Sequence, residues 1–362
     1  MVGFYTRDFR AGNVGAAVDY LTLICLNANL PGAIGKSQAT LCHEALRELV
    51  LETREFAQLL GDIRSNGTRL KGAIELRLKL IALSDQEEFL KLITMQAASV
   101  ADDSGRTTDA VLLYHLAEDY DSVIAIINRA LSEAIAVDIG QDQLRLQPLK
   151  PRAIAQQEQN QQLQQQNDSS LSLTSVDDPV VLARNMISLY NASALYFQKI
   201  RAVNRDACGL LLRMSEAKAK VAAGQWSEAL DVSSTHTSYN TRQGIRLTIY
   251  KTIESLKLLP LNAHASIPTI RASATSFNAL PPTVSRNIGP LLLWTITCIG
   301  RQREVLGARQ YGGGEGGTNR EMSEELLGSA RDLMVFAGLV KYRLGERVWE
   351  AVCSVGGDVG VY

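Results

Sequence analysis

Cys42, His43 and Glu44 are consecutive residues whose types could carry out chemistry. A histidine followed directly by glutamate begins the His-Glu-x-x-His pattern, in which two histidines one helical turn apart bind zinc. The second histidine is replaced by Arg47, so the spacing predicts no zinc site. Cys42 and His43 cannot form a nucleophile–base pair, because adjacent helix residues point about 100° apart. The segment instead predicts a solvated helix face on which Glu44 and Arg47 pair.

The other reactive residue types are scattered along the chain. His115, His236 and His264 stand at no metal-ligand spacing from one another, and His115 is more typical of a helical hairpin than of a catalytic base. Cys208 could have a lowered thiol pKa if it began a helix, but a packing role is the simpler interpretation.

The glycine run at 312–317 could suggest a phosphate-binding loop. No strand pattern precedes it and no Gly-Lys-Ser/Thr follows it, so we interpret it as a connecting loop. The sequence therefore predicts no catalytic, cofactor-binding or metal-binding residue, no bound cofactor and no enzyme.

The charge balance excludes some classes of partner. The 362 residues include 37 Lys and Arg against 38 Asp and Glu, and aromatic residues make up 6%. No extended positive field or basic–aromatic stretch is present, so direct nucleic-acid binding is not predicted. No signal peptide is recognised, because the apolar run 18–26 is broken by Asp19 and lies in a helical pattern. The most apolar later run, 290–300, is too short for a bilayer span of about 20 residues.

The five cysteines are odd in number and contain no Cys-x-x-Cys pair, which predicts reduced and mostly buried thiols. They are Cys25, Cys42, Cys208, Cys298 and Cys353.

Helical periodicity dominates the chain, and no stretch alternates like a strand. Ser84 to Glu87 has the pattern of a capping box, which predicts a helix start. Gly61 is typical of a glycine that ends a helix. Asp178 and Pro179 predict an N-cap followed by proline at the first helical position. Pro290 should kink or divide its helix. The expected helices are 14–27, 37–60, 84–100, 109–117, 122–135, 179–201, 205–223, 226–233, 241–258, 267–279, 283–306, 321–342 and 344–354.

The helix expected at 37–60 has an unusually wide apolar face. Between 41 and 60, apolar side chains occupy about half of the helix circumference, whereas a surface helix needs a stripe of little over ~100°. Such a helix must contact neighbours on two sides. Together with the paired helices, this predicts an all-α, irregular and elongated α-solenoid of stacked antiparallel helix pairs. No strict repeat period is present.

A glutamine-rich stretch divides the helical pattern. It has too little apolar surface to offset the entropy of ordering, so we expect residues 1–139 to form the first part of the solenoid, 140–177 a flexible linker and 178–362 the continuation. A glycine-rich loop is expected at 307–320.

Two surface features could serve recognition. Trp226, Trp294 and Trp349 could anchor a peptide, although each is more simply explained as core. The last helices carry a small basic excess that we interpret as a solvated face: Arg331, Lys341, Arg343 and Arg347. Partner-binding residues cannot be assigned from this pattern.

Several segments together carry a resemblance to a known family. The runs 20–32 (YLTLICLNANLPG) and 41–55 (LCHEALRELVLETRE), followed in order by 110–121, 253–262 and 330–338, resemble the nucleoporin-interacting-component family, the large linker nucleoporins of the inner ring of the nuclear pore. The resemblance is of the fungal type and spans nearly the whole chain.

This resemblance implies a solenoid related to the element of vesicle coats, and a structural role at the nuclear envelope that supports pore assembly and nucleocytoplasmic transport, including that of protein and mRNA. It implies that this portion binds the adaptor nucleoporin with an RNA-recognition-like domain. In the family, an N-terminal region recruits the channel trimer and the large inner-ring scaffold nucleoporins. Residue 1 matches a position inside the solenoid, so that region is expected to be missing here.

Two other classes remain as alternatives. A tetratricopeptide-like peptide-binding adaptor, or a vesicle-coat-type scaffold outside the pore, would also suit wide-faced helix pairs. An all-helical enzyme with an unrecognised site would need a polar pocket that the sequence does not indicate.

Overall fold

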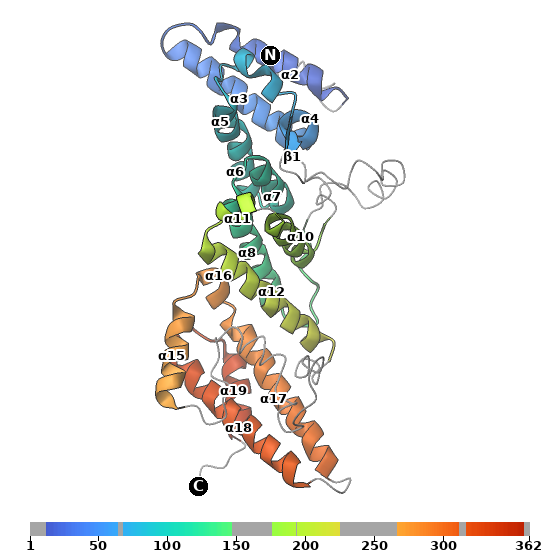
Figure 1. The fold of residues 1–362 in the computed structure, drawn as a ribbon, viewed down its shortest axis with the longest axis vertical. Helices are drawn as coiled ribbons and strands as arrows, with labels where there is room; N and C mark the ends of the chain where they lie inside the picture. Colours follow the sequence, from blue (N-terminus) through green and yellow to red (C-terminus); the bar gives the residue numbers. More distant parts are fainter. Residues whose placement is uncertain are drawn as a thin grey trace. The chain divides into compact units, whose positions relative to one another are not determined.

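The computed structural model describes residues 12–63, 68–146, 176–192, 194–224, 266–310 and 316–357 (Figure 1). The chain forms two compact units. Unit 1 comprises Met1–Ala130 and Arg145–Asn204, and unit 2 comprises Leu131–Leu144 and Arg205–Tyr362. Several predicted features lie outside the described residues. They are nearly all of the glutamine-rich stretch, the helices expected at 226–233 and 241–258, and Trp226. The predicted division at 140–177 stays a prediction.

Unit 1 consists mainly of short helices that follow one another along the chain. They are α2 (Val14–Thr22), the 3₁₀ helix η1 (Leu23–Asn27), α3 (Ala33–Thr53), α4 (Phe56–Leu60), the 3₁₀ helix η2 (Glu75–Ile81), α5 (Gln86–Phe89), the π-helical turn η3 (Leu90–Thr94), α6 (Met95–Asp103), α7 (Thr107–Leu116), most of α8 (Tyr120–Ala136), α10 (Pro179–Asn191), α11 (Ala194–Gln198) and the start of α12 (Ala202–Ala222).

Side-chain caps fix several of these helix starts. Asp178 caps α10 by accepting a hydrogen bond from the Val180 amide, 2.8 Å, with Pro179 as the first helical residue, as predicted. The predicted capping box lies one residue later than expected: Asp85 accepts from the Glu88 amide, and Glu88 accepts from the amide of Ser84.

The prediction of one continuous helix at 37–60 is wrong, because the structure has two helices there. The first, α3, starts earlier, at Ala33, and stops at Thr53, because Arg54 has the left-handed conformation, with φ 56°. A second helix, α4, then runs to Leu60 and ends at Gly61, which has the positive φ predicted for a helix-ending glycine. The wide apolar face is mostly buried, as expected, although Leu41 is 55% exposed.

Two short strands are the exception to the all-helical prediction. β1 (Gly61–Ile63) and β2 (Arg69–Lys71) pair antiparallel, with Gly61 opposite Lys71. A Cβ on Gly61 would lie 1.9 Å from the Leu70 carbonyl oxygen, so only glycine permits this approach. Three-residue strands are too short to show an alternating pattern, so sequence periodicity could not predict them.

The helices predicted at 109–117 and 122–135 are present as α7 and α8, which begin at Thr107 and at Tyr120. Glu118 has a positive φ of 61° in the turn between them. Asp119 then accepts hydrogen bonds from both the amide and the hydroxyl of Ser122, so α8 begins at Tyr120. The single helix expected at 179–201 is instead two helices, α10, which ends at Asn191, and α11, which ends at Gln198.

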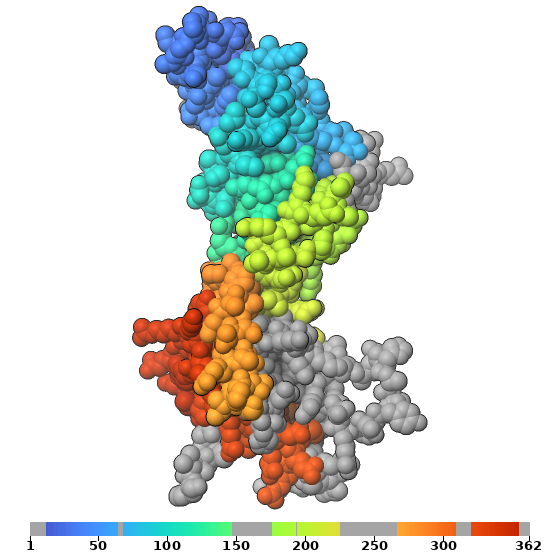
Figure 2. Space-filling view, turned by 60° about the vertical axis from the view of Figure 1, so that its left-hand side comes forward, coloured from blue at the N-terminus to red at the C-terminus, as the bar shows by residue number. Residues whose placement is uncertain are grey.

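The described residues of unit 2 include the end of α8, most of α12 and five later helices. These are α15 (Ile267–Asn278), α16 (Pro282–Ser285), α17 (Ile288–Gln310), α18 (Gly316–Leu339) and α19 (Glu346–Gly357). α17, α18 and α19 contact one another, and α15 contacts α18. In Figure 2, α15 is visible in light orange on the surface of this unit.

Two sequence expectations are corrected in unit 2. The helix predicted at 283–306 is divided at Arg286 and Asn287, so Pro290 lies in the first turn of α17, where its missing N–H is not needed. The glycine-rich loop predicted at 307–320 is wrong at both ends, because α17 extends to Gln310 and α18 begins at Gly316, while residues 311–315 lie outside the described residues. Glycine costs about 1 kcal/mol in a helix, which a long helix can absorb.

α15 shows how the later helices pack. Its buried residues Ile270, Ala274 and Phe277 fall on one stripe at spacings of four and three. Phe277 meets Phe336 of α18 edge-on, with ring centroids 6.1 Å apart. Most of the rest of α15 is exposed, which is the pattern of a helix covering one side of a core.

Polar side chains join α8 to other elements of unit 2. Ser132 donates to the Thr283 carbonyl oxygen at 2.5 Å and accepts from Arg286 and Asn287, each at 2.6 Å. Lys218 of α12 donates from Nζ to the carbonyl oxygens of Ala134 at 2.7 Å and Val137 at 2.5 Å. These carbonyls end α8 and have no partner within the helix. Lys218 therefore acts as its C-terminal cap.

We expect Lys218→Met to destabilise the protein by about 1.5–3 kcal/mol, since it leaves the last carbonyls of α8 without a charged donor. Urea unfolding followed by circular dichroism measures the change. Lys220→Met, two residues along the same helix, is the control and should change stability little. Equal effects of the two substitutions would contradict the capping role.

Candidate functional site

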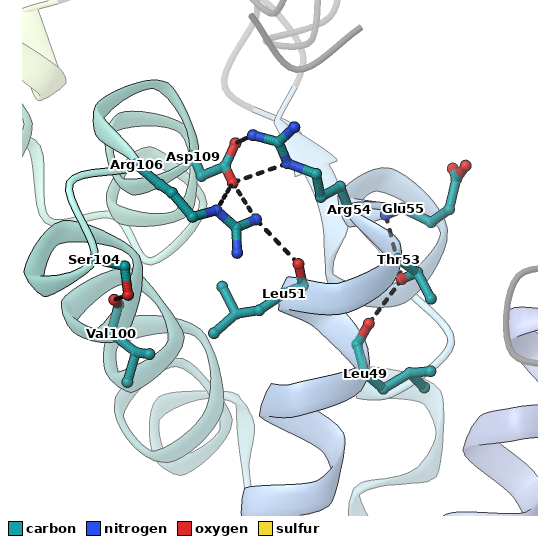
Figure 3. Close-up of polar contacts among 9 residues, drawn as sticks. All are labelled: Leu49, Leu51, Thr53, Arg54, Glu55, Val100, Ser104, Arg106 and Asp109. Carbon is teal, nitrogen blue, oxygen red and sulfur yellow. Dashed lines mark hydrogen bonds and ion pairs between the residues drawn. The ribbon is translucent and has the colours of Figure 1, made fainter. Parts of the chain in front are cut away.

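The most strongly connected polar group in unit 1 is the carboxylate of Asp109, in the first turn of α7 (Figure 3). Its side chain is completely buried. Arg54 holds it with two hydrogen bonds, from Nε to Oδ2 at 3.0 Å and from Nη2 to Oδ1 at 2.8 Å. A helix N-terminus also favours negative charge. The carboxylate thus fixes the end of α3 against the start of α7.

Arg106 completes this cluster. Its Nε donates to Asp109 Oδ2 at 2.6 Å, and its Nη2 donates to the Leu51 carbonyl oxygen at 3.0 Å (Figure 3). Leu51 lies in the last turn of α3, so Arg106 satisfies a carbonyl that the helix leaves open. Three contacts therefore join the end of α3 to the start of α7, two from Arg54 to Asp109 and one from Arg106 to Leu51. The contacts of Arg106 with Asp109 lie within the start of α7 and orient the carboxylate.

The same cluster explains the break after α3. A non-glycine residue at positive φ costs on the order of 1 kcal/mol or more. At Arg54 the cost is offset by the paired hydrogen bonds to a buried carboxylate, which are among the stronger kinds. Leaving the helix at this residue brings the Arg54 guanidinium to Asp109.

A further arginine, Arg69, makes polar contacts with a different set of elements in unit 1. Arg69 donates from Nε to Glu75 at 3.2 Å and from Nη1 to the Leu116 carbonyl oxygen at 2.6 Å, and its guanidinium lies 6.0 Å from the centre of the Phe89 ring. Glu75 is 4% exposed. This pair connects the strand β2 with η2 and with the end of α7.

The Cys42–His43–Glu44 segment is not a site, but the predicted solvated face is wrong for His43. Its ring is buried, and Nε2 donates to the Ile81 carbonyl oxygen at 2.8 Å. Arg47 donates to the Leu92 carbonyl oxygen at 2.9 Å, and burial lowers its pKa while the charge of Glu44 opposes that shift. Position 43 faces η2, which the helical pattern alone did not reveal.

His115 belongs to a buried aromatic group rather than to a catalytic pair. Its Nδ1 and the Tyr190 hydroxyl are 3.1 Å apart, and its ring also neighbours Tyr120 and Tyr196. Burial, and secondly the nearby charge of Arg69, lower the pKa of His115 to about 4. The imidazole is therefore neutral at physiological pH.

The described thiols are free, and four of the five are buried. Burial raises the pKa of Cys208 and of Cys298 to about 12 and also raises the pKa of Cys42. Cys208 lies inside α12 rather than at its start, so the packing interpretation of this thiol is supported. Cys353 is exposed.

The remaining described candidates lie in unit 2, on α17, α18 and α19 or, for Lys341 and Arg343, between α18 and α19. Trp294 is 5% exposed and belongs to the core, whereas Trp349 on α19 is 38% exposed. The predicted basic residues Arg331, Lys341, Arg343 and Arg347 are all exposed. Arg347 lies 3.6 Å from Asp138. These positions agree with a solvated face.

Sequence reasoning missed Arg54, Arg106 and Asp109 as a cluster. One signal was available: α7 is apolar on nearly every side, with Ala110 to Leu113 all buried, and Asp109 is the only acidic residue in it. A carboxylate at such a position must have a partner. The partner on α3 is 55 positions away and could not be read from the sequence.

Across the described ranges, no group of three His, Cys, Asp or Glu side chains could hold a metal ion. Every helix there is too short or too polar to cross a bilayer. Reactive side chains are instead used to join one helix to the next. The described residues thus form an all-helical fold, apart from two short strands, in which buried polar contacts join one element to another.

The sequence profile of the Nup93/Nic96 family matches residues 1–351, and the chain belongs to this family of nucleoporins. It is 48% identical to Nucleoporin NIC96 of Chaetomium thermophilum over 99% of this chain and 30% of that protein. It is 34% identical to Nucleoporin NIC96 of Saccharomyces cerevisiae, over 97% of this chain and 35% of that protein. The chain spans about a third of the length of these relatives.

The fold is similar to the crystal structure of Chaetomium thermophilum Nic96 SOL. The TM-score is 0.77 at 47% identity, and the match covers 98% of this chain and 46% of that one. This similarity confirms the predicted all-α solenoid class, and the family match confirms the resemblance seen in the sequence.

We expect Asp109→Asn to lower the free energy of unfolding by about 3–5 kcal/mol, because it leaves two partly buried guanidinium groups without their counter-charge. Asp103→Asn, at an exposed position on α6, should have almost no effect. Chemical unfolding of both variants gives the comparison. A small loss in Asp109→Asn would show that the cluster is not needed to join α3 and α7.

His115 should make stability depend on acid pH. Its pKa is near 6.5 when unfolded and about 4 when folded, so between these values the unfolded chain binds the extra proton. The histidine then costs about 2 kcal/mol of stability between pH 7.5 and pH 5. His115→Gln should remove this part of the pH dependence in urea unfolding. Tyr190→Phe, which retains the imidazole, should keep it; an unchanged profile in His115→Gln would contradict the assignment.

Proposed function

We propose that this chain is a structural scaffold of the nuclear pore complex at the nuclear envelope, and that it supports pore assembly and nucleocytoplasmic transport. The observation that carries the proposal is the family match over 1–351, together with a fold similar to that of Nic96 SOL. Relatives named as nucleoporins, in two fungi, support the same role.

The internal contacts fit a scaffold better than an enzyme. A protein that positions partners must resist deformation, and buried charged hydrogen bonds between successive helices restrain their relative motion. Asp109, His43 and His115 are each buried and bonded to another element of unit 1. We propose that the chain is not an enzyme.

At a finer level, we propose that the chain acts in the inner ring and binds other nucleoporins. The adaptor nucleoporin with an RNA-recognition-like domain is the partner proposed for this portion. Recruitment of the channel trimer and of the large inner-ring scaffold proteins is assigned to an N-terminal region of the family. The tetratricopeptide-like or coat-type alternative outside the pore is not favoured by the relatives.

A fluorescently tagged full chain in a fungal cell tests the proposal. We expect a signal at the nuclear rim and recovery of the adaptor in a pull-down. Asp103→Asn should behave like the unchanged chain, whereas Asp109→Asn should lose both signals if folding is impaired as expected. A soluble, folded chain that stays diffuse and recovers vesicle-coat or chaperone proteins would overturn the proposal.

A further inference from the structure

The two ends of the glutamine-rich segment meet in unit 1. Arg145 donates from Nη1 to Asp177 Oδ2 at 2.9 Å, and the Leu146 amide donates to the Asp177 carbonyl oxygen at 2.6 Å. Leu146 is 8% exposed, so its side chain anchors one end of the segment. Asp178 and Pro179 start α10 directly after the other end. The chain therefore leaves and returns at the same place.

Unit 1 is built from residues on both sides of this segment. Asp121 at the start of α8 accepts hydrogen bonds from the Arg201 amide and Asn204 Nδ2, each at 2.9 Å. These bonds bring the pKa of Asp121 below its usual value although burial acts to raise it. His115 and Tyr190 add a buried contact across the same gap in sequence.

Unit 2 is divided in the same way. The end of α8 lies before the glutamine-rich segment in the sequence. The residues that bond to the end of α8 lie after that segment. Lys218 caps α8 through its terminal carbonyls, and Ser132 is bonded to Thr283, Arg286 and Asn287. Ser132 and Asn287 are completely buried. Neither unit is therefore contained in the residues on one side of the segment.

We propose that the contacts between the parts of the chain before and after residues 147–175 hold both units together, and that neither unit needs the chain to be continuous or of fixed length there. Residues joined by a backbone hydrogen bond, as Leu146 and Asp177 are, have Cα atoms on the order of 5.5 Å apart, a gap that a few residues can close. A linker between independent halves would instead require 1–139 and 178–362 each to hold its own core.

A cut in the backbone between 147 and 175 should be tolerated, because separating the two fragments would expose surface that is now buried. In α8, Val123, Ile124, Ile127 and Leu131 are almost fully buried, and in α12 so are Cys208, Leu211 and Met214. Separating the fragments would break the buried contacts of His115 with Tyr190 and of Ser132 with Asn287, and any apolar surface returned to water would cost about 25 cal/mol for each Å². The fragments should therefore remain associated.

The first experiment places a site-specific protease sequence between Asn160 and Gln161 in the full chain. After complete cleavage, we expect both fragments to elute together at the position of the uncut protein, with unchanged circular dichroism. The same sample in concentrated urea provides the control, since the fragments must then separate. Elution as two species under native conditions would overturn the proposal in favour of a linker.

A second variant tests the length of the segment without a cut. Residues 147–175 are replaced by a few glycine and serine residues, which shortens the loop while retaining Arg145, Leu146 and Asp177. We expect a Tm equal to or above that of the unchanged chain, because a shorter loop costs less entropy to close. A Tm lower by several degrees, or loss of helical signal, would show that the segment contributes to the fold.

Discussion

One buried carboxylate, that of Asp109, determines how the first helices of unit 1 are joined. Because Asp109 has no exposure to solvent, its charge must be satisfied by the protein, and Arg54 and Arg106 do so from two different elements. Arg54 must leave the helical conformation to reach it. The end of α3, the start of α4 and the start of α7 therefore depend on a single charge.

Other joints in the chain follow the same principle with neutral acceptors. Arg47, Arg69 and Lys218 each donate to a backbone carbonyl of a neighbouring element. Carbonyls at helix ends have no internal partner, and a long cationic side chain can reach them while its aliphatic part packs against apolar surface. Helices of unequal length can be joined in this way without a repeating motif, which agrees with the absence of a strict sequence period.

This use of polar groups is consistent with the proposed scaffold role. His115 and the buried thiols have pKa values that keep them neutral, so they contribute packing rather than reactivity. The sequence predicted this outcome for Cys208, His115 and Trp294 from their spacing and surroundings. It did not predict the burial of His43, because the element that covers it, η2, follows more than 30 positions later and has no strong periodicity.

The sequence by itself determined the helical class, the caps at Asp178 and Gly61, the α7–α8 turn and the buried state of most cysteines. These features depend on residues within a few positions of one another, or on composition, so local chemistry is sufficient. Only the tertiary structure decided that Arg54 ends α3, that β1 and β2 pair, and that Arg145 meets Asp177. Each of these depends on a partner brought close by folding, and the energy of that contact outweighs the local preference of the chain.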